Sequence, residues 1–83
     1  MAVLPNPFEH DLQLMIQSDK SQVMSIHLVD MTGREVYRAM KSVNAGNNSV
    51  MLSALSHLSK GLSVLRVMDG KEVVSTTRVN KAR

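Results

Sequence analysis

A repeated alternation of apolar and polar residues, broken by turn residues, constrains the fold of this chain more than any other feature. Apolar residues occupy every second position from 12 to 16 and again from 24 to 28. Successive side chains of a β-strand point to opposite faces, so a period of two predicts strands that each bury one face. We therefore expect a protein built from sheets.

Turn residues separate these segments and indicate hairpins. Asp30 and Gly33 occupy the first and fourth positions of a sequence typical of a type I turn. Asp69 and Gly70 form a dipeptide that strongly favours a hairpin, and β-branched residues flank it on both sides. The sequence NAGNN at 44–48 predicts a loop, because glycine and asparagine tolerate positive φ angles.

The segments between the turns predict about seven short strands, with residues 2–4 as the first. So many short strands in 83 residues predict an all-β fold, a small antiparallel β-sandwich. In the last strand we expect Val73 and Val79 to share a face with Ser75 and Thr77.

Residues 51–62 allow two interpretations. Met51, Leu55, Leu58 and Leu62 follow the spacing of an amphipathic helix. Gly61 would cost such a helix about 1 kcal/mol, however, and the serines of this segment are poor helix formers. A strand followed by a compact loop that buries the two central leucines satisfies the same pattern. We favour the loop for residues 53–60.

Composition excludes several classes of protein. With 83 residues, of which 43% are hydrophobic, the chain suits one small globular domain. The absence of cysteine excludes disulfides and thiolate sites. The basic residues are scattered, and Phe8 and Tyr37 are the only aromatic residues, so we expect no nucleic-acid partner. No apolar run approaches the roughly 20 residues that span a bilayer, so we expect no membrane insertion.

Residues that could carry catalysis do not form a recognisable pattern. His10, His27 and His57 do not have the spacing of metal ligands. No serine lies in a G-x-S-x-G motif, and the four glycines are too far apart for a phosphate-binding loop. We predict no catalytic residue, no metal site, no cofactor and no enzymatic activity.

Four motifs follow one another along the chain: VLPNPF at 3–8, DMTGREV at 30–36, NAGNN at 44–48 and LSHLSKGL at 55–62, before a final strand with a basic end. In this order they resemble the C-terminal sorting domains of cargo proteins of the type IX secretion system of Bacteroidetes. The resemblance covers essentially the whole chain. The residues that match the family's motifs are Pro5, Asn6, Pro7, Phe8, Asp30, Gly33, Arg34, Val36, Asn44, Ala45, Gly46, Asn48, Leu55, Leu58, Gly61 and Leu62, with Arg78, Val79, Asn80 and Lys81 in the terminal strand.

Two positions depart from the family pattern. Leu4 stands where a tyrosine is common, and Ser63 replaces the tyrosine that usually follows the Gly61-Leu62 pair. Losing a buried tyrosine would remove about 1–3 kcal/mol of burial free energy. We expect nearby methionines, whose side chains adapt to irregular spaces, to compensate.

The resemblance implies an Ig-like sandwich in which residues 1–83 form a single C-terminal sorting domain excised from a larger secreted precursor. It implies a non-catalytic signal that takes a cargo from the periplasm through the outer-membrane translocon. An outer-membrane shuttle protein and a sortase would be its partners, and the sortase would remove it. The cargo would end at the outer membrane, on the cell surface or in the medium.

The terminal strand is the segment that we expect the translocon to recognise. Its edge can pair with a strand of a partner, and its basic end can attract acidic surfaces. The candidate recognition residues are therefore Arg78, Val79, Asn80 and Lys81, whereas Pro5–Phe8 would brace the fold. The same tail could instead be disordered.

Two other functions fit an Ig-like or fibronectin-like sandwich. The chain could be an adhesive module that binds a protein, although its few aromatic residues argue against a glycan platform. It could also be a spacer between domains. An exposed edge strand further allows a dimer of the isolated domain.

Overall fold

The computed structural model describes residues 1–83, which form seven β-strands and no helix. Each strand overlaps one of the seven short segments that the sequence predicts between turns. Their bounds are β1 (Ala2–Leu4), β2 (Leu12–Ser18), β3 (Gln22–Asp30), β4 (Glu35–Val43), β5 (Gly46–Leu52), β6 (Gly61–Asp69) and β7 (Glu72–Lys81).

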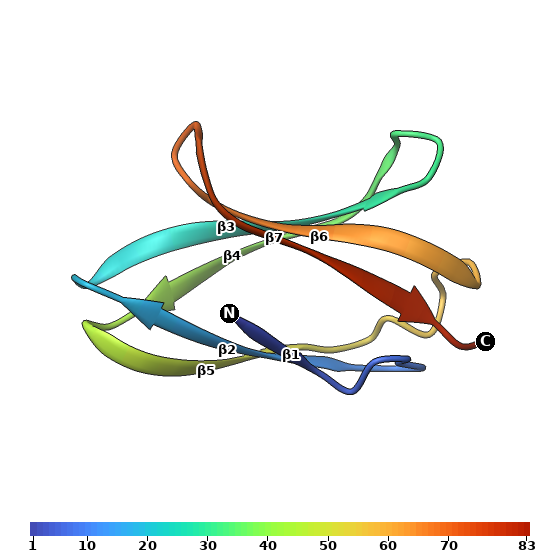
Figure 1. Ribbon diagram of the computed structural model, residues 1–83, viewed down its shortest axis with the longest axis horizontal. Coiled ribbons are helices and arrows are strands. Elements are labelled where there is room, and N and C mark those ends of the chain that lie inside the picture. The colour runs from blue at the N-terminus through green and yellow to red at the C-terminus, as the bar shows by residue number, and fades with distance from the viewer.

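The strands form two antiparallel sheets that pack face to face (Figure 1). The smaller sheet has the order β1-β2-β5, and the larger has the order β4-β3-β6-β7. Hairpins join β3 to β4 and β6 to β7 within the larger sheet. The predicted all-β sandwich is confirmed.

The core lies between the sheets and follows from the alternation of each strand. In β2 every second residue is buried, and the same holds for the central part of β3. Two core residues come from outside the strands, namely Phe8 and Leu55. The buried core consists of Phe8, Leu12, Leu14, Ile16, Met24, Ile26, Leu28, Val43, Val50, Leu52, Leu55, Leu65, Val67 and Val79.

The predicted loop at 44–48 is wrong in its second half, because β5 begins at Gly46. Gly46 and Asn47 pair with Ser18 and Gln17 of β2, so they continue the smaller sheet. Only residues 44–45 connect the two sheets at this corner. Asn48 stabilises the corner: its amide oxygen accepts from the Asn44 N–H at 2.9 Å, and its NH₂ donates to the Asn44 carbonyl at 2.9 Å.

Residues 53–60 form a loop, which confirms the interpretation that we favoured. Leu55 is fully buried, and its N–H donates to the His10 carbonyl at 2.8 Å. Leu58 packs against the core from a turn, with its N–H donating to the Leu55 carbonyl at 3.1 Å. Met51 and Leu62, the ends of the helix-like stripe, lie in strands and are about half exposed.

The prediction that Val73 and Val79 share a face is wrong, because a β-bulge lies between them. The register between β6 and β7 shifts at this point, because Val67 pairs with Ser75 whereas the next residue, Met68, pairs with Val73. Val74 is the extra residue, and it interrupts the alternation. Val79 is therefore buried in the core, but Val73 is about half exposed.

Candidate functional site

The segment that contains the two prolines lies beside the end of the last strand. The Phe8 N–H donates to the Asn80 carbonyl at 2.9 Å, and the Ala82 N–H donates to the Phe8 carbonyl at 2.7 Å. Phe8 and Lys81 thereby form a parallel bridge. We call residues 5–9 and 78–83 together the terminal clasp.

Asn6 extends the terminal clasp through its side chain. Its Oδ1 accepts from the Asn80 N–H at 3.0 Å, and its Nδ2 donates to the Arg78 carbonyl at 3.5 Å. Pro5 and Pro7 have no N–H to offer a neighbouring strand. The asparagine amide between them has an NH₂ group that donates and a carbonyl oxygen that accepts, so it pairs with the strand edge as a peptide group would.

Phe8 and Lys81 close the end of the core beneath the terminal clasp. Phe8 is 1% exposed and Lys81 is 3% exposed. The Lys81 Nζ donates to the Arg83 carbonyl, which gives the buried ammonium a partner. Glu9 holds the Arg83 guanidinium at 3.3 Å. The last residues of the chain are thus bound to the segment that follows the prolines.

The four candidate recognition residues divide into two pairs. Arg78 and Asn80 are exposed, whereas Val79 and Lys81 are buried. This division follows from the alternation of β7. Only Arg78 and Asn80 can present a side chain to a partner, and the backbone of Asn80 is already bound to Asn6 and Phe8.

Asp30, Gly33 and Arg34 form the turn between β3 and β4, as the sequence predicts. The Asp30 carboxylate accepts from the backbone N–H groups of Thr32 and Arg34 at 3.0 and 3.1 Å. A hydrogen bond from the Thr32 hydroxyl, together with these N–H groups and the Arg34 charge, holds the pKa of Asp30 below its usual 3.8. Gly33 has a φ of 89°, which its lack of a side chain permits.

The other motif residues shape the backbone or the core, and Gly61 and Leu62 also pair in register with Lys81 and Asn80 of the terminal clasp. Gly46 starts β5, and Gly61 starts β6 with a φ of 127°. Leu55 and Leu58 pack the loop onto the core. The structure joins the first and last motifs of the chain by direct hydrogen bonds and places Gly61 and Leu62 of the late motif beside the last one.

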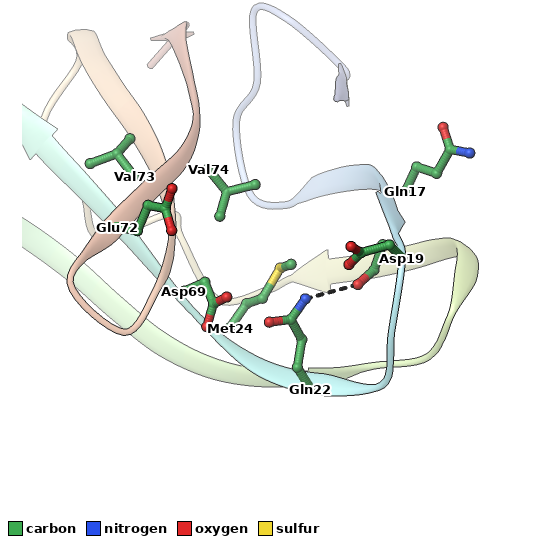
Figure 2. Close-up of a pocket in the computed structure, with 9 residues that line it drawn as sticks. Gln17, Asp19, Gln22, Met24, Asp69, Glu72, Val73 and Val74 are labelled. Atoms are coloured by element: carbon green, nitrogen blue, oxygen red, sulfur yellow. Dashed lines mark hydrogen bonds between the residues drawn. The ribbon is translucent and has the colours of Figure 1, made fainter.

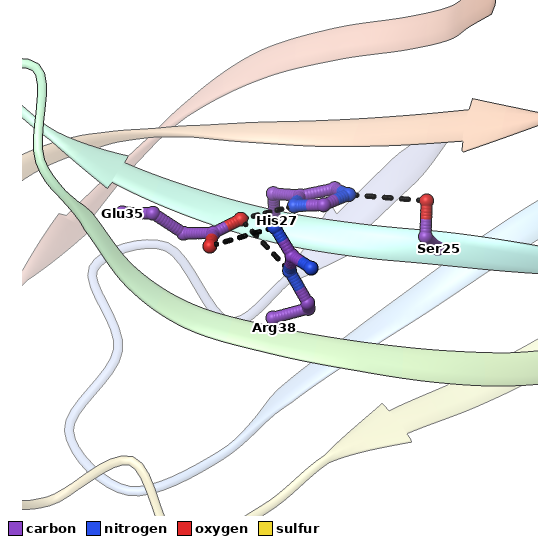
Figure 3. A network of polar contacts seen from close by, with 4 residues as sticks. All are labelled: Ser25, His27, Glu35 and Arg38. Carbon is purple, nitrogen blue, oxygen red and sulfur yellow. Dashed lines mark hydrogen bonds and ion pairs between the residues drawn. The ribbon is translucent and has the colours of Figure 1, made fainter. Parts of the chain in front are cut away.

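A polar cluster on the outer face of the larger sheet is a feature that the motifs do not reveal (Figure 3). His27 contacts Glu35 through Nδ1 and the Ser25 hydroxyl through Nε2 at 3.0 Å. Arg38 approaches the same carboxylate with Nε at 3.2 Å and Nη2 at 3.1 Å. The hydrogen bond from His27, followed by that from Arg38, keeps the pKa of Glu35 below its usual 4.5.

The sequence predicts that His27 points outward, but the residues that it contacts follow only from the register of the strands. His27 alternates with buried residues in β3, so its outward direction is predictable. Its neighbours are Arg38 of β4 and Arg66 of β6, and the pairing of three strands determines both contacts.

The largest cavity, of about 530 Å³, lies at the opposite end of β7 from the terminal clasp (Figure 2). Asp19, Asp69 and Glu72 line it, and no basic residue does. The Gln22 amide reaches the Ser18 hydroxyl at 3.0 Å across its floor. The lining of this cavity is acidic, whereas the terminal clasp carries three basic residues, namely Arg78, Lys81 and Arg83.

The structure contains no group of three or more His, Cys, Asp or Glu side chains placed to hold a metal ion. No helix in it could cross a membrane.

A family model described as "Secretion system C-terminal sorting domain" matches residues 2–81. That range includes both halves of the terminal clasp up to Lys81. No curated protein and no solved structure matches the chain. The family consists of sorting signals of type IX secretion and is not a catalytic family. Because the match covers nearly the whole chain, this protein belongs to the family of secretion system C-terminal sorting domains.

Proposed function

We propose that the type IX translocon recognises this domain in its folded state, at a surface formed by the terminal clasp and the edge of β7. Membership of the family makes the chain a sorting signal whose cargo is secreted or attached to the cell surface. The cargo passes through the periplasm, a shuttle protein of the outer membrane receives it, and a sortase then removes the domain. An adhesive or spacer role is the alternative.

The contact of Asn6 with Arg78 and Asn80 carries this proposal. It unites the first and last motifs of the family in one place, 72 and 74 residues apart in sequence. A partner that binds this surface would bind the folded domain and not the unfolded chain. Such selectivity suits a sorting signal that must be recognised before its cargo crosses a membrane.

The free edge of β7 is divided into two parts. Phe8 occupies the outward groups of Asn80 and Ala82. In an antiparallel strand, alternate residues direct both backbone groups to the same edge. The N–H and C=O of Thr76 and the N–H of Arg78 therefore face the same free edge. The part from Glu72 to Arg78 can accept a strand of a partner.

Arg78 adds charge to this edge. Its side chain is exposed and forms no ion pair within the domain, whereas Arg83 is paired with Glu9. An unpaired guanidinium can attract an acidic partner over several ångströms and then bind a carboxylate through two hydrogen bonds, in bidentate geometry.

A fusion of the domain to a periplasmic reporter tests the proposal in a cell with a type IX system. Deleting residues 79–83 would be a poor test, since it removes the buried Val79 and Lys81 and threatens the fold. Thr76→Pro is sharper, because it removes an N–H that faces the free edge while leaving the pairing with β6. Thr76→Val keeps the N–H and serves as the matched control.

We expect the wild-type and Thr76→Val fusions to leave the cell and the Thr76→Pro fusion to stay in the periplasm. Thermal unfolding of the purified domains verifies that both variants fold. Normal export of a folded Thr76→Pro fusion would contradict recognition at this edge. A fusion that stays in the periplasm regardless of the translocon would support a spacer or adhesive module.

Removal by a sortase is tested by the size of the exported reporter. In a cell with the sortase, the reporter should lose the mass of the domain. In a sortase-deficient strain, the domain should remain attached. An exported reporter that keeps the domain in both strains would contradict removal.

A further inference from the structure

Three basic side chains form a row across the outer face of the larger sheet. His27 pairs in register with Arg38 of β4 on one side and with Arg66 of β6 on the other. The neighbouring residues in these strands, among them Ile26 and Leu65, are buried in the core. Alternation therefore directs the three basic side chains away from the smaller sheet.

The row lies in a hollow of about 490 Å³. Apolar side chains of Val23, Met40 and Met68 line it together with the basic row and Glu35. In Figure 1 the tips of the β3–β4 and β6–β7 hairpins rise on the side away from β1, β2 and β5, so they flank the face on which the row lies. We call this hollow the outer groove.

The charges of the outer groove are unbalanced. Glu35 is its only acidic residue, and it is held by His27 and Arg38 (Figure 3). Arg66, on the other side of His27, pairs with no carboxylate of this chain and forms no side-chain hydrogen bond. Glu35 shows how the row holds a carboxylate at one end, and Arg66 offers a guanidinium for a second carboxylate at the other.

The apolar part of the outer groove is also exposed to solvent. Met40 is 64% exposed, and Val23 is 53% exposed. Methionine is flexible and adapts its shape to a partner. A ligand that fits would place apolar groups here and an anionic group on Arg66.

We propose that the outer groove binds an extended acidic segment of a partner protein. A carboxylate of that segment pairs with Arg66, and the apolar side chains next to it pack on Met40, Val23 and Met68. The raised hairpins admit a narrow segment but keep a flat lipid surface away from the row. The outer groove lies on the same face of the larger sheet as Arg78, but residues of β3, β4 and β6 and Gly70 line it and no residue of the terminal clasp does. The inference rests on the proposed function only in assigning the partner to the export machinery.

Nuclear magnetic resonance of the purified domain tests this without any export assay. The probe is a short capped peptide in which two glutamates alternate with leucine and valine between terminal serines. A second peptide carries glutamines in place of the glutamates. Titration to about 1 mM detects weak but specific binding through the amide shifts of His27, Arg66 and Met68.

We expect the glutamate peptide to shift these amides saturably and the glutamine peptide to bind at least about tenfold more weakly, because a charge-assisted bond is lost. Arg66→Gln should weaken binding by a similar factor. Lys60→Gln removes the same charge from the exposed loop and should leave binding unchanged.

Three kinds of result would overturn the proposal. One is the lack of a charge-dependent interaction with the peptide, seen either as no saturable shifts or as equal binding of both peptides. Another is binding to phosphatidylglycerol vesicles, but not to the peptide, in a manner that Arg66→Gln abolishes, since this would assign the groove to a membrane. The third is a shift of the same amides on concentrating the domain alone, which would assign it to a second copy. Because Thr76 and Arg78 are untouched, failure here leaves the proposed function standing, and failure of export leaves this result standing.

Discussion

The backbone N–H of Asn80 donates to the side-chain oxygen of Asn6 at 3.0 Å, which joins the two ends of the domain across 74 residues of sequence. The side-chain NH₂ of Asn6 in turn donates to the Arg78 carbonyl at 3.5 Å. A single side chain thus ties the proline-containing segment to the strand that we propose as the recognition element.

Replacing Asn6 by alanine should lower the free energy of unfolding by about 1 kcal/mol. A hydrogen bond contributes roughly 1 kcal/mol net, and because both bonds of Asn6 are exposed to water, the two together contribute about as much as one. Urea denaturation followed by circular dichroism measures the change. Asn47→Ala is the matched control, since Asn47 is also exposed but its side chain forms no hydrogen bond. Equal stability of the two variants would show that the Asn6 contacts contribute nothing.

Lys81 offers a test of how a buried ammonium is tolerated. It is 3% exposed, and its only polar partner is the Arg83 carbonyl. Lys81→Met keeps the packing of the stem and removes the charge, so we expect a melting temperature at least as high as that of the wild type. Lys81→Ala should lose about 2 kcal/mol, at ~0.8 kcal/mol for each buried methylene. A Lys81→Met domain less stable than Lys81→Ala would contradict this account.

The turn at Asp30 should make stability depend on pH. The pKa of Asp30 is lower in the folded domain than its usual 3.8, because the carboxylate accepts hydrogen bonds from Thr32 and Arg34. A lowered folded pKa stabilises the fold above the unfolded pKa, and this contribution disappears as the pH falls through the folded value.

The stabilising effect of Asp30 over Asp30→Asn should therefore be largest near neutral pH and shrink below about pH 4. Melting temperatures of both domains at a series of pH values measure it. Glu35 titrates in the same direction, so the comparison must be the difference between the two domains and not the wild-type curve alone. A difference that grows in acid would refute the assigned role of the carboxylate.

The loop at 53–60 can be tested with two leucines of opposite exposure. Leu55 is fully buried, whereas Leu62 is 47% exposed. Leu55→Ala should cost about 2–5 kcal/mol, as for other core leucines, and Leu62→Ala clearly less. Chemical denaturation distinguishes them. Similar losses at both positions would indicate the stripe of a helix, for which both leucines face the core.

The sequence predicted most of the strands because alternation and turn chemistry are local. Asp30 and Gly33 form the predicted turn, and Leu55 is buried in a loop as we favoured. The errors arise where pairing with a strand distant in the sequence determines the structure. Gly46 continues a strand because it pairs with Ser18 of β2, and Val73 leaves the face of Val79 because a bulge opposite Met68 adds one residue.

The candidate site was predicted in part. The sequence singled out Pro5–Phe8 and Arg78–Lys81 as separate segments, and the alternation of β7 could have shown that Val79 and Lys81 point inward. The hydrogen bonds of Asn6 and Phe8 with β7 could not be predicted from the sequence, because no local pattern links residues at opposite ends of a chain.

The sequence by itself thus determined the strands, their buried faces, their turns and the family, because each depends on residues close together or in a fixed order. Tertiary structure decided which strands became neighbours beyond the β3–β4 and β6–β7 hairpins that the turns predict. That choice placed Asn6 on β7 and aligned Arg38, His27 and Arg66 in one row. Pairing between strands depends on the packing of the whole core, and so these surfaces exist only once the sandwich has closed.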